Sequence, residues 1–355
     1  MTTPAAGRSA STWRSSPGWA SPAAASSPSR RRRPRPEPRH DQNFATRTPL
    51  SVQKGWPDEL DLGPVTVLTG RDRGAYPHGN SVLVEGSDRA FLIDPSLTVH
   101  REGGLPGGQV PDAVLLSHCH EDHLAGLSLF GDVPVLIHAG DRQGLDSIDR
   151  FMEIYGMDPG PSAAFAAEII ETFHYRPRPD ALTFTDGDVF DLGGVTIEAH
   201  HAPGHTRGHT VFVVPEARAA YLGDIDLSGF GPYYGDTWSD LVSFESTIDM
   251  CRNLDAEHFI TFHHKGVVSG RTQFLTALER FASAIDRRES AILEYLAAGP
   301  RTLAEMVAHR FIYRPHVELV FADSVEKRSI GLHLDRLVSQ GRVEPAGGYY
   351  RLTEA

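Results

Sequence analysis

The residues from Ser117 to Gly126, S-H-C-H-E-D-H-L-A-G, bring three histidines and one aspartate into six positions. Read as H-x-H-x-D-H, they place His118 and His120 on the same side of an extended backbone, while Asp122 and His123 follow on the next turn. The apolar run that precedes them is typical of a buried strand. This spacing predicts a loop that can serve two metal ions at the end of that strand.

Metal-competent side chains follow three further β-rich runs. They are His205, Asp224 and the adjacent pair His263 and His264. Because α/β scaffolds build their sites from loops at strand ends, we expect the four junctions to converge on one site.

Short β-rich runs recur from Pro64 onward, most of them bounded by Gly, Pro or Asp. They cover residues 65–68, 81–84, 90–93, 113–116, 133–137, 195–198, 210–214, 219–222 and 258–262. Helical periodicity predicts helices over about 239–253 and 271–286. Strands with helices between and after them predict an α/β fold whose sheets are covered on their outer faces.

With these motifs in view, the chain resembles the metallo-β-lactamase-fold hydrolases, whose five sequence motifs occur in order across about residues 60–266. The motifs are Asp94, the H-x-H-x-D-H of 118–123, the P-G-H-T of 203–206, Gly223-Asp224 and the pair His263-His264. The resemblance implies an αββα sandwich and a metal-dependent hydrolase.

The resemblance also implies two sets of metal ligands that share one carboxylate. One ion would be held by His118, His120 and His205, the other by Asp122, His123 and a histidine of the fifth motif, with Asp224 bridging them. Asp94 would orient a ligand rather than bind an ion. The family usually presents one histidine in the fifth motif and this chain presents two. We favour His263, which directly follows the strand, and keep His264 as the alternative.

Such a site predicts a hydrolase that needs no side-chain nucleophile. A water shared by two dications loses its proton near neutral pH, and the metal-bridged hydroxide can attack a carbonyl or phosphoryl centre. Asp122 or Asp224 could orient this hydroxide and pass a proton to the leaving group. The mixed ligands suit Zn²⁺ and also admit Fe or Mn. We therefore expect a small-molecule ester, thioester or lactone as substrate.

Several other residues of these motifs have simpler explanations. Packing or hydrogen bonding to a ligand is expected of His200, His201 and His209. Cys119 is expected to face the core, because its neighbours face the metals. Tyr233 and Tyr234 fit a substrate pocket or a surface loop equally well.

The first residues differ in composition from the rest of the chain. Residues 1–52 are rich in Ser, Ala, Pro and Arg and predict a disordered low-complexity segment, and no apolar stretch follows the run Arg30–Arg33 to make an export signal. Positions 1–50 hold nine basic and two acidic residues, which leaves 25 basic and 44 acidic residues, a net charge of about −19. The chain has two cysteines and no run of eighteen apolar residues. We expect a cytoplasmic protein that does not span a membrane.

The sequence predicts a catalytic domain over 53–285 and a small winged-helix-like domain over 286–355. The small domain would contain a helix at 291–296, a second opened by a capping box at Thr302–Glu305, and a third that stops at Gly341 before a hairpin. This tail resembles that of lactamase-β-2-like proteins. It holds ten basic and ten acidic residues, which disfavours nucleic-acid binding. Packing, homodimer formation and covering of the pocket are its expected roles.

Two alternatives to the hydrolase of small molecules stay open. The first is a single-strand endoribonuclease of the lactamase-β-2-like type, suggested by the tail. The second is a noncatalytic regulatory protein that keeps its metals for structure.

Overall fold

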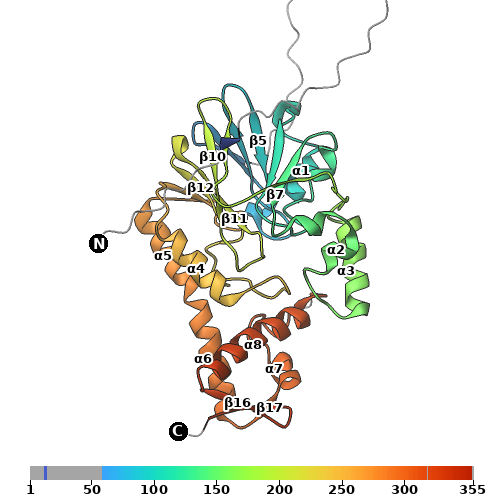
Figure 1. Ribbon diagram of the computed structural model, residues 1–355, viewed down its shortest axis with the longest axis vertical. Helices are drawn as coiled ribbons and strands as arrows, with labels where there is room; N and C mark the ends of the chain where they lie inside the picture. Colours follow the sequence, from blue (N-terminus) through green and yellow to red (C-terminus); the bar gives the residue numbers. More distant parts are fainter. Residues whose placement is uncertain (1–11, 14–57, 318, 354–355) are drawn as a thin grey trace, which may run out of the picture.

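The computed structural model describes residues 12–13, 58–317 and 319–353. Two seven-stranded sheets face each other, and helices cover the outer face of each (Figure 1). Of the predicted low-complexity segment, the described part is Thr12–Trp13, which forms β1. The predicted disorder of residues 1–52 otherwise lies outside the described residues.

The first sheet has the strand order β2-β3-β4-β5-β6-β7-β8. Its strands are β2 (Asp58–Asp61), β3 (Val65–Thr69), β4 (Ser81–Glu85), β5 (Ala90–Ile93), β6 (Ala113–Leu116), β7 (Val135–His138) and β8 (Leu182–Phe184). Pairing is antiparallel from β2 to β5 and parallel from β5 to β8. Every residue of β6 is buried, as expected of a parallel strand covered on both faces.

The second sheet has the order β1-β9-β10-β11-β12-β13-β14. Its remaining strands are β9 (Val189–Asp191), β10 (Thr196–His201), β11 (Thr210–Val214), β12 (Ala219–Tyr221), β13 (His258–Ile260) and β14 (Val267–Ser269). β12 and β13 are parallel, so their carboxyl ends meet at one edge of the sheet. The loops that carry Asp224 and His263 therefore begin side by side.

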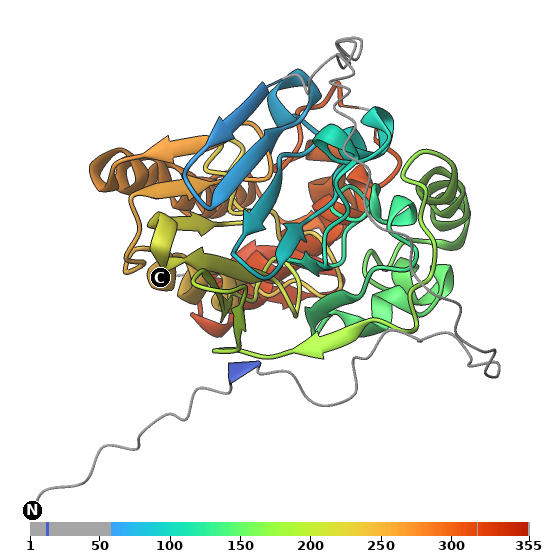
Figure 2. The ribbon, with the colours of Figure 1, turned by 90° about the horizontal axis from the view of Figure 1, so that it is seen from above.

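Apolar side chains from both sheets, among them Leu115, Phe212 and Ile260, form the core between them. The outer face of the first sheet is packed by α1 (Leu97–Glu102), α2 (Ile148–Met152) and α3 (Pro159–Glu171). The outer face of the second is packed by α4 (Leu241–Cys251) and α5 (Arg271–Ala282). Seen from above, α3 in green and α5 in orange lie on opposite sides of the molecule (Figure 2). The predicted αββα sandwich is confirmed.

The predicted helix over 271–286 is wrong in one detail, because it is two helices. α5 ends at Ala282, and α6 (Ala284–Ala297) begins after Ser283. The predicted domain boundary at 285/286 thus falls inside α6. Ile285 in its first turn packs with the second sheet, whereas Ile292 packs in the core of the small C-terminal unit. One helix therefore serves both cores.

The C-terminal unit is built from α6, α7 (Leu303–His309), α8 (Ala322–Ser339) and a three-stranded sheet of order β15-β17-β16. Its strands are β15 (Arg301–Thr302), β16 (Val343–Ala346) and β17 (Tyr349–Leu352). The capping box is confirmed, since Thr302 and Glu305 bond reciprocally at the start of α7. The winged-helix assignment stays a prediction. No helix among the described residues is long and apolar enough to cross a membrane.

A charged cluster joins this unit to the sandwich. Arg336 of α8 forms ion pairs with Glu245 of α4, at 2.7 Å, and with Glu289 of α6. His333 and Arg342 also contact Glu289, at 3.5 and 3.1 Å. The hydrogen bond to His333 and, against partial burial, the Arg336 guanidinium lower the pKa of Glu289 to about 2.

We expect Glu289→Gln to lower the thermal midpoint by a few degrees at pH 7. A depressed folded-state pKa contributes stability above the unfolded value of about 4.5, and this contribution is lost as the pH falls toward 2. The difference between the wild type and the variant should therefore shrink over that window in pH-dependent thermal unfolding. Glu294→Gln, at an exposed position on the same helix, is the control and should change little. A Glu289→Gln difference that is independent of pH would contradict the assignment.

Candidate metal centre

The seven predicted ligands lie together at one end of the sandwich. The loop after β6 supplies His118, His120, Asp122 and His123, and the loops after β10, β12 and β13 supply His205, Asp224 and His263. Their potential ligand atoms form two groups, each within 4.8 Å. The first group is His118, His120, His205 and Asp224, and the second is Asp122, His123 and His263.

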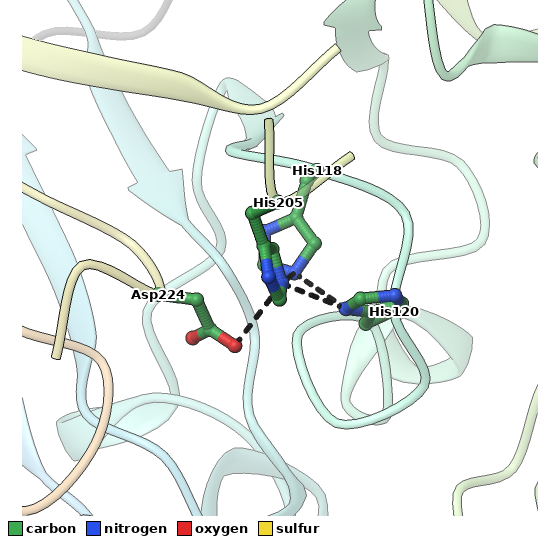
Figure 3. A group of neighbouring side chains, drawn as sticks. All are labelled: His118, His120, His205 and Asp224. Carbon is green, nitrogen blue, oxygen red and sulfur yellow. Dashed lines mark hydrogen bonds and ion pairs between the residues drawn. The ribbon is translucent and has the colours of Figure 1, made fainter. Parts of the chain in front are cut away.

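The three histidines of the first group form a triangle of ring nitrogens (Figure 3). His118 Nε2 lies 3.0 Å from His120 Nδ1, and His205 Nε2 lies 3.1 and 3.0 Å from these two atoms. In a tetrahedral site with metal–nitrogen bonds of about 2.0–2.1 Å, ligand nitrogens are about 3.3 Å apart. The triangle is therefore close to the size that a metal ion needs.

Each of these imidazoles uses its other nitrogen to contact an oxygen outside the triangle. The pairs are His118 Nδ1 with Ser117 Oγ at 3.0 Å, His120 Nε2 with Asp236 Oδ2 at 2.8 Å, and His205 Nδ1 with the Tyr233 carbonyl at 2.9 Å. If these nitrogens donate, three lone pairs converge on one point. A proton can bridge only two of them, whereas a metal ion accepts all three. The donor set therefore fits a metal ion.

The second group has the same character. His263 Nδ1 donates to the carbonyls of Gly74 and His78, at 2.9 and 3.1 Å, and its Nε2 lies 3.0 Å from Asp122 Oδ2. With Nδ1 donating, the Nε2 of a neutral His263 turns a lone pair toward this buried carboxylate oxygen. Two acceptors that face each other need a proton or a metal ion between them.

Asp224 lies between the two groups. Its Oδ1 is 3.0 Å from His123 Nε2 in the second group, and its Oδ2 is 3.3 Å from His205 Nε2 in the first. Each carboxylate oxygen therefore faces a different group, so Asp224 contacts both.

The electrostatics of the site favour positive charge. Burial disfavours a charged His123, yet Asp224, Asp122 and Asp94 outweigh it and raise the pKa of His123 well above its usual value. Against the same burial, Asp236 raises the pKa of His120 to about 9. Burial also opposes charge on Asp224, but neighbouring histidines hold the pKa of its carboxyl well below the usual range. Protons or metal ions must balance these carboxylates.

Asp94 contacts the start of the loop after β6, here named the metal loop, which carries His118 to His123. It orients His123, the kind of role predicted for it. Its Oδ2 accepts from Ser117 Oγ at 2.5 Å, His123 Nδ1 at 2.8 Å and Tyr221 Oη at 2.7 Å, and its Oδ1 accepts from the Ser117 amide at 2.7 Å. The backbone of Asp94 has φ 47°, a left-handed conformation that is uncommon outside glycine. The strain is maintained by four hydrogen bonds to a fully buried carboxylate.

Two further carboxylates, Asp141 and Asp236, hold the loops that carry His120 and His205, and neither was predicted from the sequence. Buried Asp141 accepts from the Cys119 amide at 3.1 Å, Thr206 Oγ1 at 2.6 Å and the Gly208 amide at 2.6 Å, and so ties the two histidine loops together. Asp236 holds His120 as described above. Asp141 follows a strand end, which was a usable signal, whereas Asp236 lies in a loop without a motif.

The Pro-Gly turn before His205 requires its glycine. Gly204 has φ 124°, and a Cβ atom there would lie 2.3 Å from the Phe244 amide nitrogen of α4. The turn packs directly on α4, and this close approach aims His205 into the site.

Residues 76–264 match the family described as the metallo-beta-lactamase superfamily. The chain belongs to this superfamily. Two solved structures support the fold. A metallo-beta-lactamase family protein from Thermus thermophilus has a TM-score of 0.60 and 22% identity, and the match covers 82% of this chain and 99% of that one. A beta-lactamase domain protein from Burkholderia ambifaria has a TM-score of 0.62 and 16% identity, with 86% of this chain and 97% of that one covered.

The relatives of this superfamily member match stretches of different length in the chain. An uncharacterized protein of Mycobacterium tuberculosis is 36% identical over 159 residues, which is 42% of this chain and 66% of that protein. The chain therefore spans slightly less than two thirds of that relative. A hydroxyacylglutathione hydrolase of Acidiphilium cryptum is 26% identical over 245 residues, 69% of this chain and 84% of that enzyme. A human acyl-coenzyme A thioesterase is 26% identical over 176 residues, which is 43% of this chain and 61% of that enzyme.

Of the remaining residues singled out in the sequence of this superfamily member, His209 and His264 adjoin the two groups and the others do not. His209 Nδ1 contacts the Ala202 carbonyl at 3.1 Å and its Nε2 accepts from the Asp224 amide at 3.2 Å, so it positions Asp224. His200 and His201 lie on β10, away from both groups, and Cys119 is buried in the core beneath the first sheet. His264 is exposed at the rim of the cavity.

A cavity of about 280 Å³ opens onto both groups. Tyr233 lines it, whereas Tyr234 is buried and bonds His333 of α8 at 2.9 Å. Glu121 also lines it and bonds the hydroxyls of Tyr76, at 2.9 Å, and Tyr155. Burial and the charge of Asp122 raise the pKa of Glu121 to about 7.

The C-terminal unit and the loop before α8 complete this cavity through Tyr313, Leu319 and Phe321. Phe321 is anchored by its ring contact with Phe165 of α3, at 5.3 Å between centroids. The predicted covering of the pocket by the C-terminal unit therefore matches the lining of the cavity.

We expect Asp94→Asn to weaken the binding of the ion at the second group by about 10- to 100-fold. The amide nitrogen would face groups that donate to Asp94, and His123 would lose its fixed orientation. Competitive titration of Zn²⁺ against a chelator measures the change. Asp255→Asn, at an exposed position, is the matched control. Unchanged affinity in Asp94→Asn would contradict the role assigned to Asp94.

Proposed function

We propose that this protein is a dinuclear metal-dependent hydrolase that cleaves a small thioester, ester or lactone. The observation that carries the proposal is the pair of ligand groups that share Asp224 and face one cavity of about 280 Å³. One ion would be held by His118, His120 and His205, the other by Asp122, His123 and His263, with Asp224 contributing to both.

Similarity to named enzymes ranks thioesters first among the substrates. The names of the Acidiphilium cryptum hydroxyacylglutathione hydrolase and the human acyl-coenzyme A thioesterase both describe release of an acyl group from a thiol. The volume of about 280 Å³ suits an acyl group of modest size. Tyr76, Tyr155 and Tyr233 line the cavity beside His263, His120 and His205.

The chain's own residues would divide the chemistry as follows. Two divalent ions, for which Zn²⁺ suits the imidazole and carboxylate donors, would supply Lewis acidity and lower the pKa of a bound water. Asp122 and Asp224 would orient the attacking water and carry a proton from it toward the leaving group. Asp94, Asp236 and the Tyr233 carbonyl would keep the histidines in place, so that little reorganisation is needed during the reaction.

Asp122→Ala should reduce kcat/KM for acyl thioesters by about a hundredfold or more, because it removes both a proposed ligand and a proton carrier. The assay compares acyl thioesters, aryl esters, lactones and single-stranded RNA on protein whose metal content has been quantified. His264→Ala serves as the control at the rim of the same cavity. Failure of the metal-replete protein to turn over any acyl substrate would refute the proposal, and cleavage of RNA alone would favour the endoribonuclease.

The two histidines of the fifth motif provide a matched test of the ligand set. His263→Ala should lower the bound metal from about two ions per chain toward one, because His263 faces Asp122 at 3.0 Å. His264→Ala should keep both ions, because His264 is exposed. Elemental analysis after dialysis measures the stoichiometry. Loss of an ion in His264→Ala with retention in His263→Ala would reverse the assignment.

A further inference from the structure

A second cavity of about 490 Å³ adjoins the cavity that faces the metal groups. The two cavities have Phe230 and Tyr313 in common, whose ring centroids are 5.6 Å apart. The two cavities are therefore neighbours that share an aromatic wall, so an extended ligand held at the metal groups would reach the second cavity across Phe230 and Tyr313.

The second cavity is basic. Arg287, Arg288 and Arg314 line it, and none of its lining residues is acidic in the part of the chain that the structure describes. Arg287 donates to Ser283 Oγ at 2.6 Å, so its known acceptor is neutral. Since the chain outside positions 1–50 carries a net charge of about −19, three arginines without a lining carboxylate form an unusual local environment.

Arg288 gives the strongest indication that this cavity suits an anion. It is only 6% exposed, and its two terminal nitrogens donate to the carbonyls of Pro232, at 2.6 Å, and Phe230, at 2.8 Å. Its guanidinium carbon lies 5.1 Å from the ring centroids of Phe230 and Tyr234. All these partners are neutral. A buried charge is costly unless it is compensated, so the positive potential is available to a bound anion.

The loop that carries Tyr313 and Arg314 is held in place from α8. The Glu326 carboxylate is fully buried and accepts from the backbone amides of Phe311, Ile312 and Tyr313, at 3.0, 2.9 and 2.7 Å. Three hydrogen bonds from consecutive backbone amides fix the segment immediately before Arg314. The wall between the cavities is thus preorganised, which lowers the entropic cost of binding.

We propose that this second cavity, here named the arginine cavity, binds an anionic group of the substrate whose acyl carbon lies at the metal groups. The substrate would be an acyl thioester or ester whose leaving portion carries phosphate or carboxylate. Exposed Arg287 and Arg314 would donate to the anion, and Arg288 would contribute its charge. Because it names a substrate class, this inference rests on the proposed hydrolase.

Three thioesters with one acyl group test the proposal: S-acetyl-N-acetylcysteamine, which is neutral, acetyl-coenzyme A, which carries phosphates, and S-acetylglutathione, which carries carboxylates. The variant is Arg287→Gln with Arg314→Gln, and the control is Arg89→Gln, at an exposed position in the turn between β4 and β5. An unchanged thermal midpoint checks that the variant folds.

We expect the double variant to lose about 10- to 100-fold in kcat/KM, mainly through KM, on at least one anionic thioester. The neutral thioester should change by less than about twofold, and Arg89→Gln should change none of them. The thioester that is affected identifies phosphate or carboxylate as the recognised group. Equal losses on the neutral and anionic thioesters, or no loss on either anionic one, would overturn the proposal.

Calorimetric binding separates this proposal from the hydrolase proposal. S-methyl coenzyme A and S-methylglutathione are thioethers that cannot be hydrolysed, and one of them should bind the wild type about tenfold or more tightly than the double variant. Arginine-dependent binding by a metal-replete protein that turns over no thioester, ester or lactone would refute the hydrolase and keep the arginine cavity. Absence of binding, or binding equal in both proteins, would refute the arginine cavity even if thioesters are hydrolysed.

Discussion

The convergence of hydrogen-bond acceptors around Asp224 is the constraint on which the rest of the site depends. Three imidazole nitrogens lie 3.0–3.1 Å apart on one side of it, and Asp122, His123 and His263 gather on the other. Such groups repel one another unless a cation lies between them. Holding them there requires a rigid surrounding structure, because the repulsion would otherwise separate the loops.

Buried carboxylates provide much of that rigidity. Asp94 fixes the first turn of the metal loop, Asp141 joins this loop to the loop of His205, and Asp236 orients His120. Each accepts from groups on more than one segment, so that loops distant in sequence keep a common geometry. The parallel pairing of β5 with β6 and of β12 with β13 determines where these loops begin.

The C-terminal unit extends this arrangement beyond the metal centre. α6 belongs to both cores, and the cluster around Glu289 joins α8 to α4 and α6. With that orientation set, Glu326 holds the loop of Tyr313 against the cavity. A unit that could have been independent thus supplies walls for the proposed substrate site.

The sequence alone was sufficient for the superfamily and the αββα order of elements. It also predicted which residues gather in the candidate metal centre, apart from the choice within the fifth motif, because they lie in short motifs at the ends of apolar runs. The end of a strand fixes the position of the loop residues that follow it, so His118, His205 and Asp224 could be predicted from the local pattern. Only the tertiary structure distinguished His263 from His264, since this depends on which imidazole faces Asp122. Asp236, Tyr313 and Arg288 carry no motif. Their positions result from long-range packing of irregular loops and of the C-terminal unit, for which local periodicity contains no information.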